Sequence, residues 1–211
     1  MYCTYTSILR ICRIVSSIVS MPLEIIEGNL LDAPEDCIVQ QCNCVTDRPH
    51  GLSKHIADRF PYGNVYARKD VRRVPGNIAV LEERTAENKD SDNCNDNNKN
   101  DAKEETTDGT TTKGGRVIVC AFAQLGPGKP GTYQNTDFRL GPDTYELRHA
   151  WFRACLDKLA ACVRAHGSVA FPYKIGCGLA GGNWEADYLP MLRRWSEEAR
   201  PDLLVRIYRR R

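Results

Sequence analysis

The chain has 211 residues, of which 42% are hydrophobic and 27% are charged. This is enough for one domain of ordinary size with additions and a buried core, which excludes a wholly disordered or collagen-like chain. The formal net charge of +2 gives no reason to expect a nucleic-acid partner. No run of about 18 apolar residues is present, so the sequence predicts no transmembrane helix and no membrane partner.

Ten cysteines are present, but none forms a CxxC pair with a neighbour. Structural zinc sites need clustered pairs of ligands, so we predict no metal site. Most of the cysteines lie in apolar runs, such as Val-Ile-Val-Cys120-Ala-Phe. We interpret them as buried reduced thiols and expect a reducing compartment, the cytoplasm or the nucleus.

Residues 1–20 differ in composition from the rest of the chain. They include Arg10 and Arg13 and no acidic residue, a profile that also fits an organelle presequence. A second methionine, Met21, lies at the start of the region that forms the first predicted strand. We interpret residues 1–20 as a dispensable leader and residues 21–211 as the domain, and a presequence stays open as the alternative.

The first half of the domain predicts two strands and a helix. The strand Leu23–Glu27 leads into Gly28-Asn29-Leu30-Leu31, and the strand Cys37–Cys42 leads into Asn43. A loop containing His50 and Gly51 then precedes a helix with Leu52, Ile56 and Phe60 on one face. An Asn at the end of an apolar strand offers a donor and an acceptor to ribose hydroxyls, although such an Asn is also typical of a turn cap.

A low-complexity segment, residues 86–115, separates the strands Ile78–Glu82 and Arg116–Phe122. Eight acidic residues against four lysines leave it at −4, so the rest of the chain carries about +6. It has no large apolar residue to bury, so we predict a disordered insertion between two paired strands.

The second half predicts a helix, a strand, a glycine-rich loop, a helix and a last strand. The first helix carries Leu147, Trp151, Phe152, Leu156, Leu159 and Val163, and the second carries Tyr188, Leu192, Trp195 and Ala199. Pro190 fits the second helix only in its first turn, so we place its start near Asp187. The strands are Ser168–Pro172 and Leu203–Tyr208.

Gly176, Gly178 and Gly181 fit the pattern GxGxxG directly after the strand Ser168–Pro172. Glycines at this spacing let backbone N–H groups approach a phosphate. A dinucleotide-binding Rossmann fold carries this pattern in its first βα unit, whereas here only one helix and one strand follow. The pattern therefore indicates a phosphate-binding loop rather than an NAD site, with a glycine-rich turn without a ligand as the alternative.

These motifs, in this order, resemble the macrodomain family of ADP-ribose-binding modules. Gly28-Asn29-Leu30-Leu31 and Cys42-Asn43-Cys44 are similar to the yeast-type ADP-ribose 1''-phosphate phosphatases. Ile175-Gly-Cys-Gly-Leu179 is also similar to the terminal ADP-ribose glycohydrolases. The resemblance covers residues 21–84 and 116–208. It implies a three-layer α/β/α domain with a mixed six-stranded sheet and ADP-ribose lying across its crest.

The resemblance also assigns roles to residues. Asn29, beside Leu30, would accept a hydrogen bond from the adenine amino group where the family commonly has an acidic residue, and Tyr208 is a candidate to cover the ring. Asn43 would contact the distal ribose, and the loop at Gly51, Leu52 and Ser53 would close over it. The diphosphate would lie in the glycine loop, which comprises Gly176, Cys177, Gly178, Leu179, Ala180, Gly181 and Gly182.

Both catalytic patterns of these relatives are incomplete. Gln40 stands where the phosphatase-like proteins have a His, and Ala180 stands where the glycohydrolase-like proteins have an Asp. The segment Gln124–Lys129 gives no clear match to the glycohydrolase Lys. The candidate catalytic residue is therefore His50; His55, Asp137, Lys174 and Cys177 are further substitutes.

We therefore expect a monomer that binds ADP-ribose or an ADP-ribosylated macromolecule and hydrolyses a derivative of it, without a cofactor. One alternative is a non-catalytic reader of ADP-ribosyl groups, favoured by the losses at positions 40 and 180. The other is a fragment of an NAD-binding oxidoreductase, which the late position of the glycine loop disfavours.

Overall fold

A computed structural model describes residues 23–83, 116–133, 141–163, 167–198 and 201–211 of the chain. The predicted leader, the predicted insertion at 86–115 and Asp137 lie outside these ranges. The strands are β1 (Glu24–Glu27), β2 (Cys37–Asn43), β3 (Ile78–Leu81), β4 (Val117–Gln124), β5 (Ser168–Pro172) and β6 (Leu204–Arg209). The helices are α1 (Leu52–Arg59), α2 (Tyr145–Cys162) and α3 (Leu189–Glu198), and a π-helical turn, Trp184–Tyr188, leads directly into α3.

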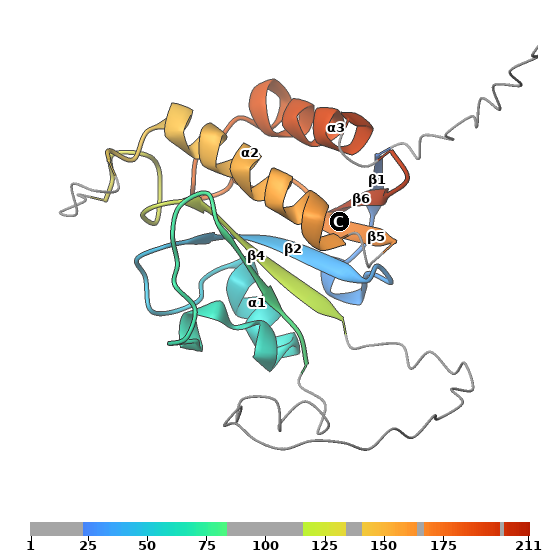
Figure 1. Cartoon of the computed structure of the whole chain (residues 1–211), viewed down its shortest axis with the longest axis horizontal. Helices are drawn as coiled ribbons and strands as arrows, with labels where there is room; N and C mark the ends of the chain where they lie inside the picture. The colour runs from blue at the N-terminus through green and yellow to red at the C-terminus, as the bar shows by residue number, and fades with distance from the viewer. Residues whose placement is uncertain (1–22, 84–115, 134–140, 164–166, 199–200) are drawn as a thin grey trace, which may run out of the picture.

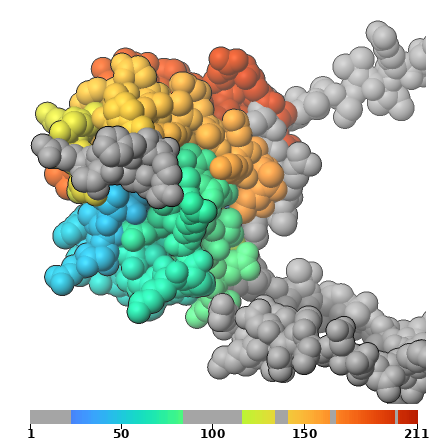
Figure 2. Space-filling view, turned by 60° about the vertical axis from the view of Figure 1, so that its left-hand side comes forward, coloured from blue at the N-terminus to red at the C-terminus, as the bar shows by residue number. Residues whose placement is uncertain are grey.

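The six strands form one mixed sheet in the order β1-β6-β5-β2-β4-β3. All neighbouring pairs are parallel except β3 and β4, which are antiparallel. Helices α2 and α3 cover one face, and α1 with its following short turns covers the other (Figure 1). Figure 2 shows the α1 layer, in cyan and green, below the α2–α3 layer, in yellow to red. This arrangement confirms the predicted three-layer α/β/α fold.

The alternation of side chains along β2 explains why the sheet is covered on both sides. Cys37 and Val39 pack into the core beneath α2 and α3, whereas Ile38 and Cys42 pack into the core around α1. Successive residues of a strand point to opposite faces, so a strand buried on both sides is apolar throughout. Gln40 is an exception to this apolar pattern, because its polar side chain is buried on the α1 side of the sheet.

The boundaries differ from the sequence prediction mainly at two places. Strand β4 continues to Gln124, two residues past the predicted end at Phe122. The last helical segment begins at Trp184 rather than near Asp187, because the Asn183 side chain accepts a hydrogen bond from the Ala186 N–H at 3.1 Å. Pro190 is the second residue of α3, but the π-helical turn runs directly into α3, so Pro190 follows a full helical turn and does not lie in the first turn as predicted. Proline lacks the N–H that a residue inside a helix donates, and here it directly follows the π-helical irregularity.

Candidate functional site

The carboxyl ends of five strands meet at one edge of the sheet. Because β1, β6, β5, β2 and β4 are mutually parallel, the segments that follow β1, β2, β4 and β5 lie along this edge, which we call the crest. Backbone hydrogen bonds hold the starts of these segments in place: the Cys44 N–H donates to the Leu125 carbonyl at 2.9 Å, and the Tyr173 N–H donates to the carbonyl of Tyr208 in β6 at 2.8 Å. Parallel α/β sheets bind ligands at this edge. The crest brings together the two segments that the sequence singles out, after β2 and after β5.

The glycine loop, residues 176–182, follows β5 and is closed by two backbone hydrogen bonds of its own. The Gly182 N–H donates to the Gly176 carbonyl at 3.1 Å, and the Gly181 N–H donates to the Gly178 carbonyl at 3.0 Å. In contrast, the N–H groups of Gly178, Leu179 and Ala180 donate to no residue in the described part of the chain. Successive free N–H groups in a turn form an anion-binding concavity. The loop therefore has the chemistry that a diphosphate needs.

Tyr188 explains two of the glycines in this loop. Gly176 has φ +75°, and a Cβ at this position would lie 2.4 Å from the Tyr188 ring. A Cβ at Gly182 would also lie 2.4 Å from that ring. Any side chain at either position would collide with the buried ring of Tyr188. A Cβ at Gly178, on the other hand, would meet no atom within 4 Å, so this glycine faces open space.

The loop after β4 forms the neighbouring wall of the crest. The methylene groups of Lys129 lie over Gly181, since Lys129 Cγ is 2.7 Å from the ideal Cβ position of that glycine. The Lys129 side chain is exposed. Although the sequence offers no clear match to a catalytic Lys in this segment, the structure places one cationic side chain directly against the glycine loop.

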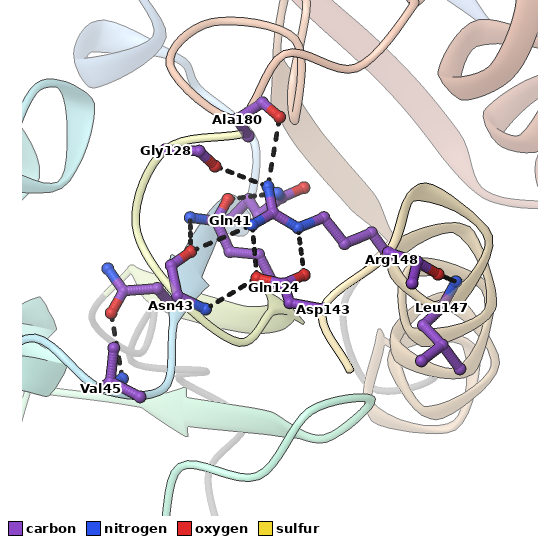
Figure 3. A network of polar contacts seen from close by, with 11 residues as sticks. Gln41, Asn43, Val45, Gln124, Gly128, Asp143, Leu147, Arg148 and Ala180 are labelled. Carbon is purple, nitrogen blue, oxygen red and sulfur yellow. Dashed lines mark hydrogen bonds and ion pairs between the residues drawn. The ribbon is translucent and has the colours of Figure 1, made fainter. Parts of the chain in front are cut away.

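A buried ion pair joins these two loops, and the sequence interpretation missed it. Arg148, on α2, is 1% exposed, and its Nε and Nη2 each donate to a carboxylate oxygen of Asp143 at 2.6 Å (Figure 3). Its remaining N–H groups donate to the carbonyls of Gly126, Gly128 and Ala180. One signal was available in the sequence, because Arg148 precedes Phe152 by four residues and thus lies on the apolar face of its helix.

Asn43 lies at the end of β2, where it shapes the loop before α1. Its side-chain oxygen accepts hydrogen bonds from the N–H groups of Val45 and Thr46 and from the Thr46 hydroxyl, at 2.8 to 3.1 Å. Its side-chain nitrogen lies 3.4 Å from the Tyr66 hydroxyl. The structure therefore shows the turn-capping role, and contact with a ribose stays a prediction.

The start of α1 offers a second group of free donors. Gly51 has φ +55°, and no side chain caps the helix. The first intrahelical bonds run from Lys54 and His55 to the Gly51 carbonyl, while Leu52 and Ser53 donate to no backbone acceptor in the described ranges. The Ser53 side chain is buried, with its Oγ 4.0 Å from Cys42 Sγ. Ser53 therefore presents its backbone, rather than its hydroxyl, to the crest.

The predicted adenine end is built from the segment after β1 and the end of β6. The Asn29 oxygen accepts from the Leu31 N–H at 3.3 Å, and its side-chain nitrogen donates to Asp32 at 2.8 Å. Leu30 is buried. The Tyr208 ring packs against Gly28, and its hydroxyl donates to the buried carboxylate of Glu35 at 2.8 Å. Burial, and then this carboxylate, raise the pKa of Tyr208 to about 12. The Tyr208 hydroxyl is thus already hydrogen-bonded to a buried group of the protein, the Glu35 carboxylate.

The candidate catalytic side chains lie in different surroundings. His50 is exposed and makes no hydrogen bond or ion pair with the described residues, and His55 is exposed on α1. The Gln40 amide nitrogen donates to the Gly63 carbonyl and to Cys120 Sγ, both at 3.3 Å, on the α1 side of the sheet. The Lys174 ammonium lies 5.5 Å from the centre of the Tyr173 ring. Of these residues, only His50 stands in the loop between β2 and α1 with its ring free.

Cys177 is a packing thiol rather than a nucleophile. Its Sγ lies 3.3 Å from the Ile175 carbonyl, to which it donates. Burial, which is the larger cause, and the negative charge of Asp187 together raise the pKa of Cys177 to about 11. At neutral pH the sulfur therefore stays protonated, whereas the reactive form of cysteine is the thiolate.

Two hollows lie near these elements. One, of about 470 Å³, adjoins the glycine loop and is lined by residues that include Tyr173, Lys174 and Trp184. A larger one, of about 550 Å³, lies between α2 and the segment of the π-helical turn and α3, and its lining includes none of the predicted site residues. We place the site at the crest, because the free backbone donors are there. Among the described residues, no group of His, Cys, Asp and Glu is arranged to hold a metal ion, and no helix is long and apolar enough to cross a membrane.

Comparison with known proteins finds similarity to solved structures, whereas comparison by sequence finds no match. No protein-family model matches the chain, and no curated protein matches it. The macrodomain of DarG from Mycobacterium tuberculosis is 21% identical, with a TM-score of 0.54 over 88% of this chain and 96% of that one. The macrodomain of Thermus aquaticus DarG is 17% identical, with a TM-score of 0.55 over 89% and 97%. Thermosipho africanus DarTG in complex with ADP-ribose is 15% identical, with a TM-score of 0.55 over 90% and 42%. The chain has the macrodomain fold.

Proposed function

We propose that the chain binds ADP-ribose along its crest. The observation that carries this proposal is the run of three free N–H groups at Gly178, Leu179 and Ala180, together with the uncapped start of α1. Backbone donors of this kind hold a diphosphate without a charged side chain. Two proteins of the same fold support the choice of ligand, since the Thermosipho structure and an Oceanobacillus iheyensis macrodomain variant are both described with ADP-ribose.

We further propose that the bound compound is hydrolysed. In a phosphatase reaction, water adds to the phosphorus of ADP-ribose 1''-phosphate, the bond between phosphorus and the ribose oxygen breaks, and ADP-ribose and phosphate leave. In a glycohydrolase reaction, water adds to the anomeric carbon and the ADP-ribosyl group leaves its carrier. His50 is the one candidate here with a free ring in the β2–α1 loop, so it would accept the proton of the attacking water. These finer assignments follow the yeast-type phosphatases and the terminal glycohydrolases that the sequence resembles.

A non-catalytic reader is the second candidate function. The side-chain amide of Gln40 cannot transfer a proton, and it donates toward Gly63 and Cys120 on the α1 side of the sheet. Ala180 has no functional group, and its carbonyl is bound by Arg148. A protein that keeps the donors for the diphosphate but lacks both of these groups would hold ADP-ribosyl groups without releasing them.

Replacing Gly178 with valine tests the binding site. The new side chain enters open space, so we expect a change in the free energy of unfolding of less than about 0.5 kcal/mol. It also covers the free N–H groups, so we expect the Kd for ADP-ribose to rise about ten-fold or more, which corresponds to about 1.4 kcal/mol. Calorimetric titration gives the Kd, and urea unfolding gives the stability.

Gly167→Val is the matched control. Gly167 is also an exposed glycine whose Cβ would meet no atom within 4 Å, but it lies at the start of β5, at the opposite end of the strand from the glycine loop. Its valine variant should bind ADP-ribose as the wild type does. Unchanged affinity in Gly178→Val would remove the glycine loop from the site. Tight binding of NAD with none of ADP-ribose would overturn the proposed function as a whole.

Turnover separates the enzyme from the reader. The protein is incubated with ADP-ribose 1''-phosphate and, separately, with a mono-ADP-ribosylated protein, and the release of phosphate and of ADP-ribose is followed. The enzyme releases one of the two, and His50→Ala slows that release while ADP-ribose still binds. Binding without release from either compound leaves the reader.

A further inference from the structure

The Arg148 guanidinium has no hydrogen-bonding capacity left for a ligand. It carries five N–H groups. Nε donates to one oxygen of Asp143; Nη2 donates to the other and to the Gly126 carbonyl; Nη1 donates to the carbonyls of Gly128 and Ala180. With five acceptors for five N–H groups, and 1% of its surface exposed, Arg148 cannot bind a substrate itself. Any effect on the site must pass through the groups it holds.

Those groups belong to the two walls of the crest. Gly126 and Gly128 lie in the loop after β4, and Ala180 lies in the glycine loop. Figure 3 shows Gly128 and Ala180 beside the Arg148 guanidinium. Asp143 strengthens the contact with the loop after β4, since its Oδ2 also accepts a hydrogen bond from the Gly126 N–H at 3.2 Å. One side chain therefore fixes the distance between two loops that no strand pairing holds together at this point.

The contact with Ala180 also sets the polarity of the glycine loop. Three carbonyls of the loop are engaged within the protein: those of Gly176 and Gly178 by backbone bonds, and that of Ala180 by Arg148 at 3.2 Å. A carbonyl oxygen facing the groove would repel a diphosphate. The Asp143 carboxylate balances the charge of Arg148, so the pair adds no net charge beneath the loop.

We propose that Arg148 is a positioning residue that locks the glycine loop and the loop after β4 into one phosphate-binding unit. The proposal rests on the proposed function for its ligand, although the locking itself does not depend on one. Lysine at this position would keep the charge but offers only three N–H groups, all from a single atom, against the five contacts that Arg148 makes.

Hydrogen exchange of Arg148→Lys tests the locking without any ligand. The Gly181 and Gly182 amides are hydrogen-bonded within the glycine loop, so their exchange rates report its order. We expect both rates to rise about ten-fold or more, with the Val119 amide in the central sheet unchanged. Arg153→Lys is the matched control, because Arg153 is an exposed arginine on the same helix. Leu203→Ala, a core substitution at the start of β6, controls for general loss of stability.

ADP-ribose titration of the same variants tests the consequence for binding. We expect the Kd to rise about ten-fold or more in Arg148→Lys and to stay unchanged in Arg153→Lys and Leu203→Ala. If Arg148→Lys does not fold, the double variant Arg148→Gln with Asp143→Asn removes both buried charges together and takes its place.

The outcomes separate the two proposals. Exchange at Gly181 and Gly182 that matches either control overturns the role of Arg148, whatever binds. Faster exchange with an unchanged Kd overturns its role in the site. Absence of ADP-ribose binding by the wild type overturns the proposed function, while the exchange rates still decide whether Arg148 locks the loops.

Discussion

Asn43 is a side chain whose role is visible in its hydrogen bonds. One oxygen accepts three hydrogen bonds from residues 45 and 46, so it closes the turn that leads from β2 toward α1. The sequence leaves two roles open for this residue, ribose contact and turn cap. The second follows from local chain geometry and is found in the structure, whereas the first needs the ligand.

Asn43→Ala should lower the free energy of unfolding by about 2 kcal/mol, because two backbone N–H groups and one hydroxyl lose their acceptor in a largely buried place. Asn43→Asp keeps an oxygen in the same position and should lose less than half as much. Urea unfolding of the three proteins at neutral pH measures both values. Equal losses in the two variants would show that the contact of the side-chain nitrogen with Tyr66 matters more than the turn.

Features of the candidate site could be read from the sequence where one local pattern defines them. The spacing of Gly176, Gly178 and Gly181 is such a pattern, and the free N–H groups lie within it. Arg148 and Asp143 were not found, because their acceptors come from loops far away along the chain, and only the folded sheet brings these loops together. Tyr208 shows the same limit, since its partner Glu35 precedes β2.

At the scale of elements, α2 carries the residue that joins the two loops, so its first turn matters to the site. Thr144 precedes the helix, and its hydroxyl accepts a hydrogen bond from the Leu147 N–H at 3.2 Å. This N-cap fixes where the helix starts, and Arg148 follows one turn later. The position of Arg148 therefore depends on a cap that lies outside the site.

Thr144→Ala should lower the free energy of unfolding by about 1 kcal/mol, the usual loss for an N-cap hydroxyl. Thr144→Ser keeps the acceptor and should retain most of this stability. Thermal unfolding with both variants is the measurement. A serine variant as unstable as the alanine variant would mean that the methyl group of Thr144, rather than its hydroxyl, stabilises the start of α2.

The elements themselves were largely predictable from periodicity. All six strands are present near their predicted positions, and the predicted apolar residues of α2 at Phe152, Leu156 and Leu159 are buried. In the last helical segment Tyr188, Leu192 and Trp195 are buried as predicted, whereas Ala199 lies outside the described residues. The π-helical turn at Trp184–Tyr188 was not predicted, because its one extra residue per turn leaves no separate mark in an apolar pattern. It matters to the site because it places Tyr188 beneath Gly176 and Gly182.

At the scale of the whole molecule, the buried thiols make the free energy of unfolding depend on pH in the alkaline range. Burial raises the pKa of Cys37 and that of Cys155 from 9.0 to about 12. Both side chains lie in the core between the sheet and α2. Between pH 9 and pH 12, the unfolded thiols lose their protons while the folded ones keep them. The unfolded state then binds fewer protons, so the free energy of unfolding falls as the pH rises.

Each of the two thiols should lower the free energy of unfolding by up to about 1.4 kcal/mol per pH unit in this range. Urea unfolding at pH 8, 9 and 10 with a reductant gives the slope. Cys37→Ala should make the slope shallower by the share of one thiol, in addition to a constant loss of stability from the smaller side chain. A slope identical to that of the wild type would show that Cys37 ionises equally in both states.

The antiparallel pairing of β3 and β4 lets the connection between these two strands vary in length. Leu81 pairs with Ile118, so the described residues on either side of this connection, Glu83 and Arg116, follow β3 and precede β4 at the amino end of β4, away from the crest. The entropy of closing such a connection grows only with the logarithm of its length, by about 0.6 kcal/mol for each doubling. We therefore expect insertions and deletions at this end to change stability little and to leave the spacing of the crest loops unchanged. The same position suits the attachment of a label or a fused domain.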